Sequence, residues 1–386
     1  MDHLFMGLPV AAQGGQPVVP EPLKARVVAS ALRRWATANN LSTVLPGGTE
    51  EQLLDAVAPL TMSEVQTNFL RGRGISSIAF NDESAKVMVY TRKRVTKEQL
   101  KHLPNSAGGC EIEYPSGYID DLNIALAEAQ GAKWTVVQTA AGANHYACGS
   151  SISPGNVADA GTLGCLVRDA DGALYGLSNN HVTGACSHSP VMLPILAPGV
   201  IDVAANTLNP FTLGLHQRTL PMRVGTHGNI NIFENRDAAI FRIIDEAQVS
   251  SMQGSLYDTP DNVIAIADNM LVEKVGRTTQ HTTGAIVGRE LMPIAVGVGA
   301  PTYRFQGQVI FGDVWVVHGD NDLFSDAGDS GSLVVSRNQD GTKSAVGLIF
   351  AGGPDSSAPG GKKSLILPLQ PILDELHVTL VHGHNV

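Results

Sequence analysis

Short apolar runs separated by turn residues dominate the pattern of hydrophobic and polar positions along this chain. One buried run covers residues 162–167, an Asp-Gly pair follows at 171–172, and a second run covers residues 174–178. This spacing is typical of a β-hairpin. Three similar runs near the N-terminus predict further strands, at residues 75–80, 86–90 and 110–114.

Helical patterns are fewer. Pro22 begins a segment that places Leu23, Val27, Ala31 and Trp35 on one face of a helix. Thr96 and Gln99 have the spacing of a capping box for a short helix. Further helices are predicted at residues 50–57, 121–130 and 369–376. The whole pattern predicts a mainly β chain that is preceded by a small α/β unit.

Composition supports this organisation. The chain has 386 residues, of which 43% are hydrophobic and 16% charged, and this predicts two or three globular units with sizeable cores. We expect an N-terminal α/β accessory region at residues 1–140, with residues 1–20 mobile because they are rich in Gly, Pro, Ala and Gln. The remainder, residues 141–386, forms the main β domain.

Charge and targeting signals exclude several classes of function. The formal net charge of −10 argues against a nucleic-acid-binding protein. No apolar run reaches the ~20 residues of a membrane span. The first residues lack the basic and apolar regions of a signal peptide, so we expect a cytoplasmic protein. None of the four cysteines has metal-ligand spacing, and we expect neither a metal nor another cofactor.

A serine between glycines is the strongest chemical signal. Residues 328–332 read Gly-Asp-Ser-Gly-Ser, and Ser330 is the candidate nucleophile. Glycine lets the backbone turn tightly and direct its N–H groups at one point. The amides of Gly328 and Ser330 are therefore the candidate oxyanion hole.

A base and an acid are needed to activate this serine. His181 lies at the end of the predicted hairpin, and a strand end holds a catalytic side chain in a fixed position. Asp237 precedes Ala-Ala-Ile-Phe, a run that would carry its carboxylate into the interior, where it needs a partner such as an imidazole N–H. The chain order is then His181, Asp237, Ser330.

With these residues in place, the chain resembles the trypsin/chymotrypsin-like serine peptidases, which share that order. It looks most similar to the group that contains the plant narrow-leaf protease and its bacterial relatives. The resemblance rests on residues 178–182, 236–240, 274–279, 328–332 and 346–350. It implies a chymotrypsin-like double β-barrel, with Ser330 as nucleophile, His181 as base and then acid, and Asp237 as the residue that orients the histidine.

The same resemblance implies supporting residues. Lys274 is expected to pair with Asp329, the role that a new N-terminus has in zymogen-derived members. Phe324 is expected near the base of the pocket for the residue before the cleaved bond. Substrate-pairing positions are expected on the following strand, at Phe350, Ala351 and Gly352. No acidic residue clearly occupies the pocket base, which favours a small or apolar residue before the cleaved bond, unless the loop turns Asp326 toward the pocket.

Two points stay open in the sequence. Cys165 and Cys186 flank the histidine hairpin as a disulfide does in secreted family members, but the absence of a signal peptide favours buried free thiols. The leading hypothesis for function is a serine endopeptidase that acts on protein or peptide substrates and is regulated by its N-terminal region. Alternatives are a latent protease-fold scaffold, a hydrolase or transferase of small esters, and a defence or stress protease with one partner. A homo-oligomer is compatible with the sequence, which specifies none.

Overall fold

The computed structural model describes residues 24–41, 62–122, 136–138, 144–203, 211–225, 230–338 and 340–386. Several expectations lie outside these residues: the mobile start, the helix at 50–57 and the boundary at residue 140. The helix expected at 121–130 also lies outside them except for its first two residues, and neither of these is helical.

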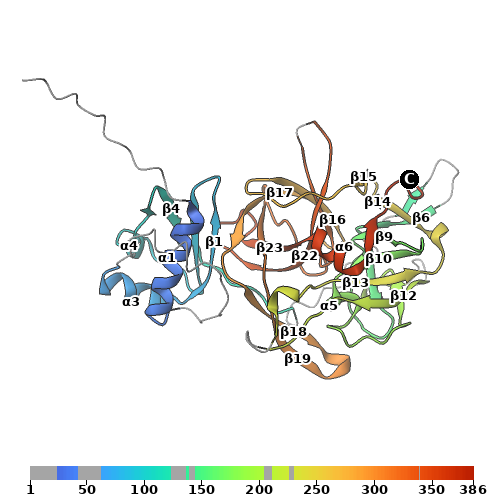
Figure 1. Ribbon diagram of the computed structural model, residues 1–386, viewed down its shortest axis with the longest axis horizontal. Helices are drawn as coiled ribbons and strands as arrows, with labels where there is room; N and C mark the ends of the chain where they lie inside the picture. Colours follow the sequence, from blue (N-terminus) through green and yellow to red (C-terminus); the bar gives the residue numbers. More distant parts are fainter. Residues whose placement is uncertain are drawn as a thin grey trace, which may run out of the picture.

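The N-terminal part is a small α/β unit, at the left of Figure 1. The amphipathic helix and the three strands expected there are present. The expected capping box holds α4, because Thr96 Oγ1 accepts from the Gln99 amide. The unit has its own core, in which Val28 and Leu32 of α1 pack with Val87 and Val89 of β2. Its elements are α1 (Ala25–Ala38), α3 (Glu64–Arg73), β1 (Ile75–Asn81), β2 (Lys86–Thr91), α4 (Lys97–Leu100), β3 (Ser106–Ala107) and β4 (Cys110–Glu113).

The centre of the molecule is a closed barrel of six strands. Its order is β16, β21, β22, β23, β20, β17, and β17 pairs back with β16. Its interior is filled by apolar side chains, among them Val272, Ile286 and Val334. The strands are β16 (Leu271–Gly276), β17 (Gln280–Glu290), β20 (Trp315–Gly319), β21 (Leu333–Ser336), β22 (Ala345–Pro354) and β23 (Lys362–Pro368).

The N-terminal unit and this barrel share one sheet. β1 pairs antiparallel with the far end of β17, where Ala79 lies opposite Glu290. The buried Lys363 of β23 reaches the same place: its Nζ lies 3.1 Å from Glu290 Oε1 and 3.4 Å from the ring centroid of Tyr90. The two parts are therefore joined by hydrogen-bonded strands and by a buried cation.

A second, open sheet of eight strands curls into a half-barrel, at the right of Figure 1. The predicted hairpin is its β9–β10 pair, in which Leu177 lies opposite Cys165. The order of the sheet is β24 (Val378–Leu380), β9 (Cys165–Asp169), β10 (Leu174–Ser178), β13 (Ala239–Ile243), β12 (Phe211–Thr219), β11 (Pro194–Ala197), β7 (Ser151–Pro154) and β8 (Gly161–Thr162).

The two barrels face each other across a shared core. Leu177 and Ile240 of the open sheet pack in one cluster with Leu348 and Leu367 of the closed barrel. The expected C-terminal helix, α6 (Leu369–Leu376), closes this layer with its apolar face. The remaining strands are β5 (Val136–Gln138), β6 (Asn144–Cys148), β14 (Val249–Gln253), β15 (Tyr257–Asp258) and the hairpin of β18 (Ile294–Ala300) and β19 (Phe305–Phe311). The expected mainly β architecture, with two facing barrel-like sheets and a small α/β unit before them, is confirmed.

Candidate active site

His181 lies in α5 (Asn180–Thr183), a single helical turn that follows directly on β10. The two residues before it hold that turn in place. Asn179 Nδ2 donates to the carbonyl of Asp237 at 2.6 Å, and Asn180 Nδ2 donates to the carbonyl of Leu220 at 2.9 Å. The histidine is therefore carried by a strand end and fixed by buried amides.

Asp237 faces this histidine from the start of β13. Its carboxylate is fully buried and makes two contacts with His181: Oδ1 accepts from the backbone N–H at 2.9 Å, and Oδ2 lies 2.5 Å from Nδ1. Burial disfavours a charged imidazole, but the charge of Asp237 and its hydrogen bond outweigh that effect and raise the pKa of His181 above 6.5. A carboxylate on Nδ1 leaves Nε2 to exchange a proton with another group.

The serine loop brings Ser330 toward this pair. Gly328 and Gly331 have φ angles of +94° and +91°, which L side chains rarely adopt. Thr162 of the open sheet binds the loop twice: its Oγ1 donates to the Gly328 carbonyl and its N–H to the Ser330 carbonyl, both at 2.9 Å. The loop is thus shaped by glycine and held by the opposite barrel.

The backbone donors of the loop are available. In the described part of the chain, neither the Gly328 amide nor the Ser330 amide donates a hydrogen bond, while the Gly331 amide is bound to the Ile349 carbonyl at 2.9 Å. Two free N–H groups beside a serine can stabilise the oxyanion that forms when the serine attacks a carbonyl.

One cavity collects these groups. It has a volume of about 100 Å³, and His181, Ser330 and Gly328 are among its lining residues. Ser330 Oγ makes no hydrogen bond to another described residue. In enzymes without substrate such bonds are often long and tighten only when the complex forms. The arrangement places a hydroxyl, an imidazole and two amides around one space.

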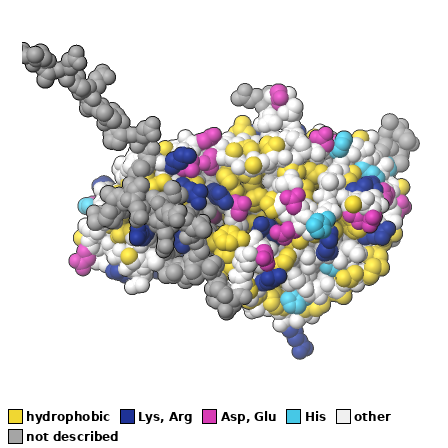
Figure 2. Space-filling model, viewed as in Figure 1, with side chains coloured by type: hydrophobic (Ala, Val, Ile, Leu, Met, Phe, Trp, Pro, Cys, Tyr) yellow, Lys and Arg dark blue, Asp and Glu magenta, His cyan; other side chains and the backbone are white. Residues whose placement is uncertain are grey.

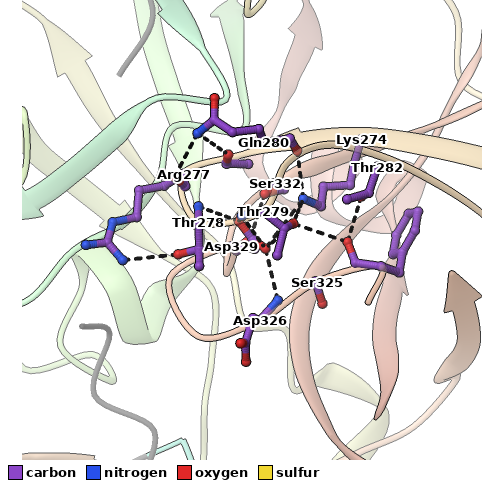
Figure 3. A network of polar contacts seen from close by, with 12 residues as sticks. Lys274, Arg277, Thr278, Thr279, Gln280, Thr282, Ser325, Asp326, Asp329 and Ser332 are labelled. Atoms are coloured by element: carbon purple, nitrogen blue, oxygen red, sulfur yellow. Dashed lines mark hydrogen bonds and ion pairs between the residues drawn. The ribbon is translucent and has the colours of Figure 1, made fainter. Parts of the chain in front are cut away.

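Asp329 does not line the cavity, and its carboxylate belongs to a polar network (Figure 3). Its carboxylate accepts from the amides of Thr278, Thr279 and Asp326, and from the Thr279 hydroxyl at 2.7 Å. Lys274 Nζ lies 3.4 Å from Asp329 Oδ2, and both side chains are fully buried. Burial lowers the pKa of Lys274, and the negative charge of Asp329 offsets part of that effect.

A second buried ion pair crosses between the barrels. Arg277 follows β16 of the closed barrel, and its guanidinium forms a two-point contact with Asp202 of the half-barrel, in which Nε lies 2.7 Å from Oδ2. Neither side chain is exposed. Asp202 is not among the residues expected from the sequence, because the two partners lie far apart in the chain and only the fold brings them together.

The four expected substrate-binding residues separate into two groups. Ala351 and Gly352 line the cavity. Phe324 does not: its ring is 1% exposed and packs inside the closed barrel. Phe350 also lies outside the lining, in the core between the barrels, where its ring centroid is 5.0 Å from that of Phe311. Burial in a packed core stabilises large apolar rings such as these two.

The cavity lining also includes residues outside the predicted set of site residues. Asp326 and Lys362 both line the cavity and form a half-exposed ion pair at 2.7 Å. Residues 120–122, from the link after the N-terminal unit, line it as well. The sequence had marked Asp326 as an acidic residue close to the pocket, whereas nothing local marked residues 120–122.

Other features bear on the remaining expectations. All four cysteines are free and buried, and burial raises the pKa of both the Cys165 and Cys186 thiols to about 12. Within the described ranges, no group of His, Cys, Asp and Glu side chains has the arrangement of a metal site. The described helices include none with the length and apolar character needed to cross a membrane. Acidic and basic side chains are interspersed on the face shown in Figure 2.

Comparison with known proteins gives one similarity in sequence and several in structure. No protein-family model matches the chain. The Narrow leaf 1 protein of Oryza sativa subsp. japonica is 25% identical over 295 residues, which are 69% of this chain and 48% of that protein, so the chain spans about half of its length. Protease A of Thermobifida fusca covers 61% of this chain with all of its own, at 17% identity and a TM-score of 0.40. A Nocardiopsis protease covers 60% with 97% of its own chain, at 18% identity and a TM-score of 0.38.

Proposed function

We propose that this chain is a serine endopeptidase that hydrolyses peptide bonds of protein or peptide substrates. The observation that carries the proposal is the hydrogen-bonded His181–Asp237 pair, which opens onto the same cavity as Ser330. A hydroxyl beside an oriented imidazole is the arrangement that acyl transfer needs.

The mechanism assigns one role to each group. His181 Nε2 accepts the proton of Ser330 as Oγ attacks the substrate carbonyl, and Asp237 stabilises the imidazolium that results. The amides of Gly328 and Ser330 bind the oxyanion of the tetrahedral intermediate. His181 then gives its proton to the leaving amine, which leaves an acyl group on Ser330. In the second half of the reaction, His181 takes a proton from water as the water attacks this acyl group, and the acid product is released from Ser330.

The residue before the cleaved bond is proposed to be small or apolar. Two of the charged side chains that line the cavity, Asp326 and Lys362, form an ion pair at 2.7 Å. A charged substrate residue would have to break that pair. Uncharged residues face no such competition, and the small volume of the cavity favours compact ones.

Reaction with a fluorophosphonate probe tests the proposal, because the probe needs an activated serine and an oxyanion hole. We expect mass spectrometry to locate the label on Ser330 and the Ser330→Ala variant to remain unlabelled. His181→Ala should lower the labelling rate at least 100-fold. His188→Ala is the matched control, since that histidine packs on Phe305 outside the cavity lining and its loss should leave labelling unchanged. Absence of labelling in the wild type and in every variant designed to open the cavity would refute the proposal.

A further inference from the structure

The substrate-side edge of β22 begins where its partner strand ends. β21 pairs with β22 as far as Leu348, and β23 covers the other edge up to Pro354. Beyond Leu348, the edge of β22 that β21 leaves unpaired faces the cavity, which is lined by Ala351, Gly352 and Gly353. An extended peptide could add to such an edge through main-chain hydrogen bonds.

That edge is already covered by the chain itself. Residues 117–122, here called the cleft segment, run antiparallel to it: Gly117 lies opposite Asp355, and the Asp120 amide donates to the Gly352 carbonyl at 2.9 Å. The backbones are in direct contact, because a side chain at Gly353 would collide with the carbonyl of Tyr118. The cleft segment therefore uses the acceptor that a substrate strand would need.

Beyond β22 the cleft segment contacts β18. The Leu122 amide donates to the Gly297 carbonyl at 2.8 Å, and the Gly297 amide donates to the Asp121 carboxylate at 3.0 Å. Gly297 belongs to β18, which is outside the closed barrel. Asp120, Asp121 and Leu122 line the same cavity as His181 and Ser330. The segment thus lines the cavity and is bonded to both β22 and β18.

We infer that the cleft segment is an internal ligand of the substrate-binding edge, so that the chain as described is latent and gains activity when this segment is released. The inference rests on the endopeptidase function proposed above and gives the expected N-terminal regulation a location. A strand edge offers one set of donors and acceptors, so the segment and a substrate cannot both use Gly352.

The attachment beside the cavity is light enough to be reversible. Two backbone hydrogen bonds, one bond to a side chain and the packing of the partly buried Leu122 against the core hold residues 120–122. A typical hydrogen bond changes an equilibrium constant by about two- to tenfold. Asp121 is exposed, and Tyr118 is 41% exposed. By contrast, the preceding Ser116 is fixed by bonds in both directions with Ser356 at 2.9 Å. Residues 120–122 can therefore move while the N-terminal unit stays in place.

The test compares two double variants in the full chain. Asp120→Pro with Leu122→Pro removes both amide donors, since proline has no N–H, whereas Asp120→Ala with Leu122→Ala changes the same side chains and keeps the donors. Each is made with and without Ser330→Ala. The probe is a fluorescein-labelled synthetic peptide that copies residues 115–122, and its binding is followed by fluorescence anisotropy.

We expect the proline variant to bind this peptide at least tenfold more tightly than the wild type or the alanine variant, in the Ser330→Ala background where no cleavage occurs. With Ser330 present, the same variant should hydrolyse casein about tenfold faster. Equal peptide affinity in all three proteins would overturn the inference. Tighter binding without fluorophosphonate labelling of any protein would show that the cleft segment is a ligand of the β22 edge, but would refute the endopeptidase proposal and with it the latency.

A milder variant guards against misfolding of the proline protein. Asp121→Ala removes one acceptor at an exposed position and leaves every backbone donor in place. We expect it to raise peptide affinity about two- to fivefold, with an unchanged thermal unfolding midpoint. An unchanged affinity in this variant would count against the inference even if the proline variant did not fold.

Discussion

The two barrels hold their halves of the candidate site by different means. The open sheet positions His181 through a tight hairpin, two asparagine amides and one carboxylate, all close to the histidine turn or to β13. The closed barrel positions Ser330 through a glycine loop backed by two buried ion pairs, Lys274 with Asp329 and Arg277 with Asp202. The partners of the histidine therefore all belong to its own sheet and its loops, whereas the serine loop also depends on a buried ion pair that crosses from the closed barrel to the other sheet, Arg277 with Asp202.

The largest effect on activity should come from a change at Asp237, the carboxylate beside the histidine. Asp237→Asn keeps the shape but loses the charge and the preferred tautomer of His181, and we expect kcat/KM for a peptide substrate to fall by about 10³- to 10⁴-fold. Asp313→Asn is the control, because that carboxylate pairs with Arg289 in a half-exposed position away from the cavity. A loss of less than tenfold would show that Asp237 does not orient the histidine.

The next effect should be on stability. Asp202→Ala leaves the guanidinium of Arg277 buried without its carboxylate, and we expect a loss of about 3–5 kcal/mol in the free energy of unfolding, measured with urea. The control Asp320→Ala breaks a half-exposed pair with Arg337, which should cost no more than about 1 kcal/mol. Similar costs for the two variants would mean that the pair between the barrels adds no more than a surface contact.

A smaller effect is expected at the other buried pair. Lys274→Met removes the cation, but Asp329 keeps three amide donors and the Thr279 hydroxyl. We therefore expect a loss of about 1–3 kcal/mol in unfolding free energy, with slower labelling of Ser330 by the fluorophosphonate probe. Unchanged stability together with unchanged labelling would show that the amides alone hold Asp329.

The smallest effect concerns pH. His181 must be neutral to accept a proton, so kcat/KM should fall as the pH drops through its folded-state pKa, which the charge of Asp237 raises above 6.5. Asp237→Asn should move this acidic limb to lower pH, and His188→Ala should not move it. The same raised pKa means that the charged His181–Asp237 pair stabilises the fold at low pH and that this contribution is lost as the pH rises through the folded value. An acidic limb at the same pH in Asp237→Asn and in the wild type would contradict the assignment of Asp237 as the partner of His181.

Features that depend on neighbouring residues could be predicted from the sequence. The alternation and turn chemistry of residues 162–178 correctly placed the β9–β10 hairpin, and the spacing of Thr96 and Gln99 correctly placed a capped helix. The roles of His181, Asp237 and Ser330 remain predictions, although the fold brings these three residues to one cavity or its wall. The structure contains other histidine–carboxylate pairs, such as His318 with Asp355, so such a pair alone does not mark a site.

Features that depend on which way a strand faces could not be predicted. Phe350 and Ala351 are adjacent, yet a register shift in the pairing with β23 occurs between Ile349 and Ala351, where one side chain turns to the core and the other to the cavity. Position relative to Ser330 carries no information about such a bulge. The cleft segment is a stronger case, because its contacts with β22 join residues more than half the chain apart.

The strand pairing of β1 with β17 also bears on how this protein can be divided. The N-terminal unit is not a detachable appendage: it continues the barrel sheet and supplies the tyrosine ring over the buried Lys363. A chain cut between the two parts would expose part of the β17 edge, a template for aggregation, and would strip the aromatic cover from a buried cation. In evolution the two parts would be inherited as one module, and in the laboratory release of the cleft segment is better sought by substitution than by truncation.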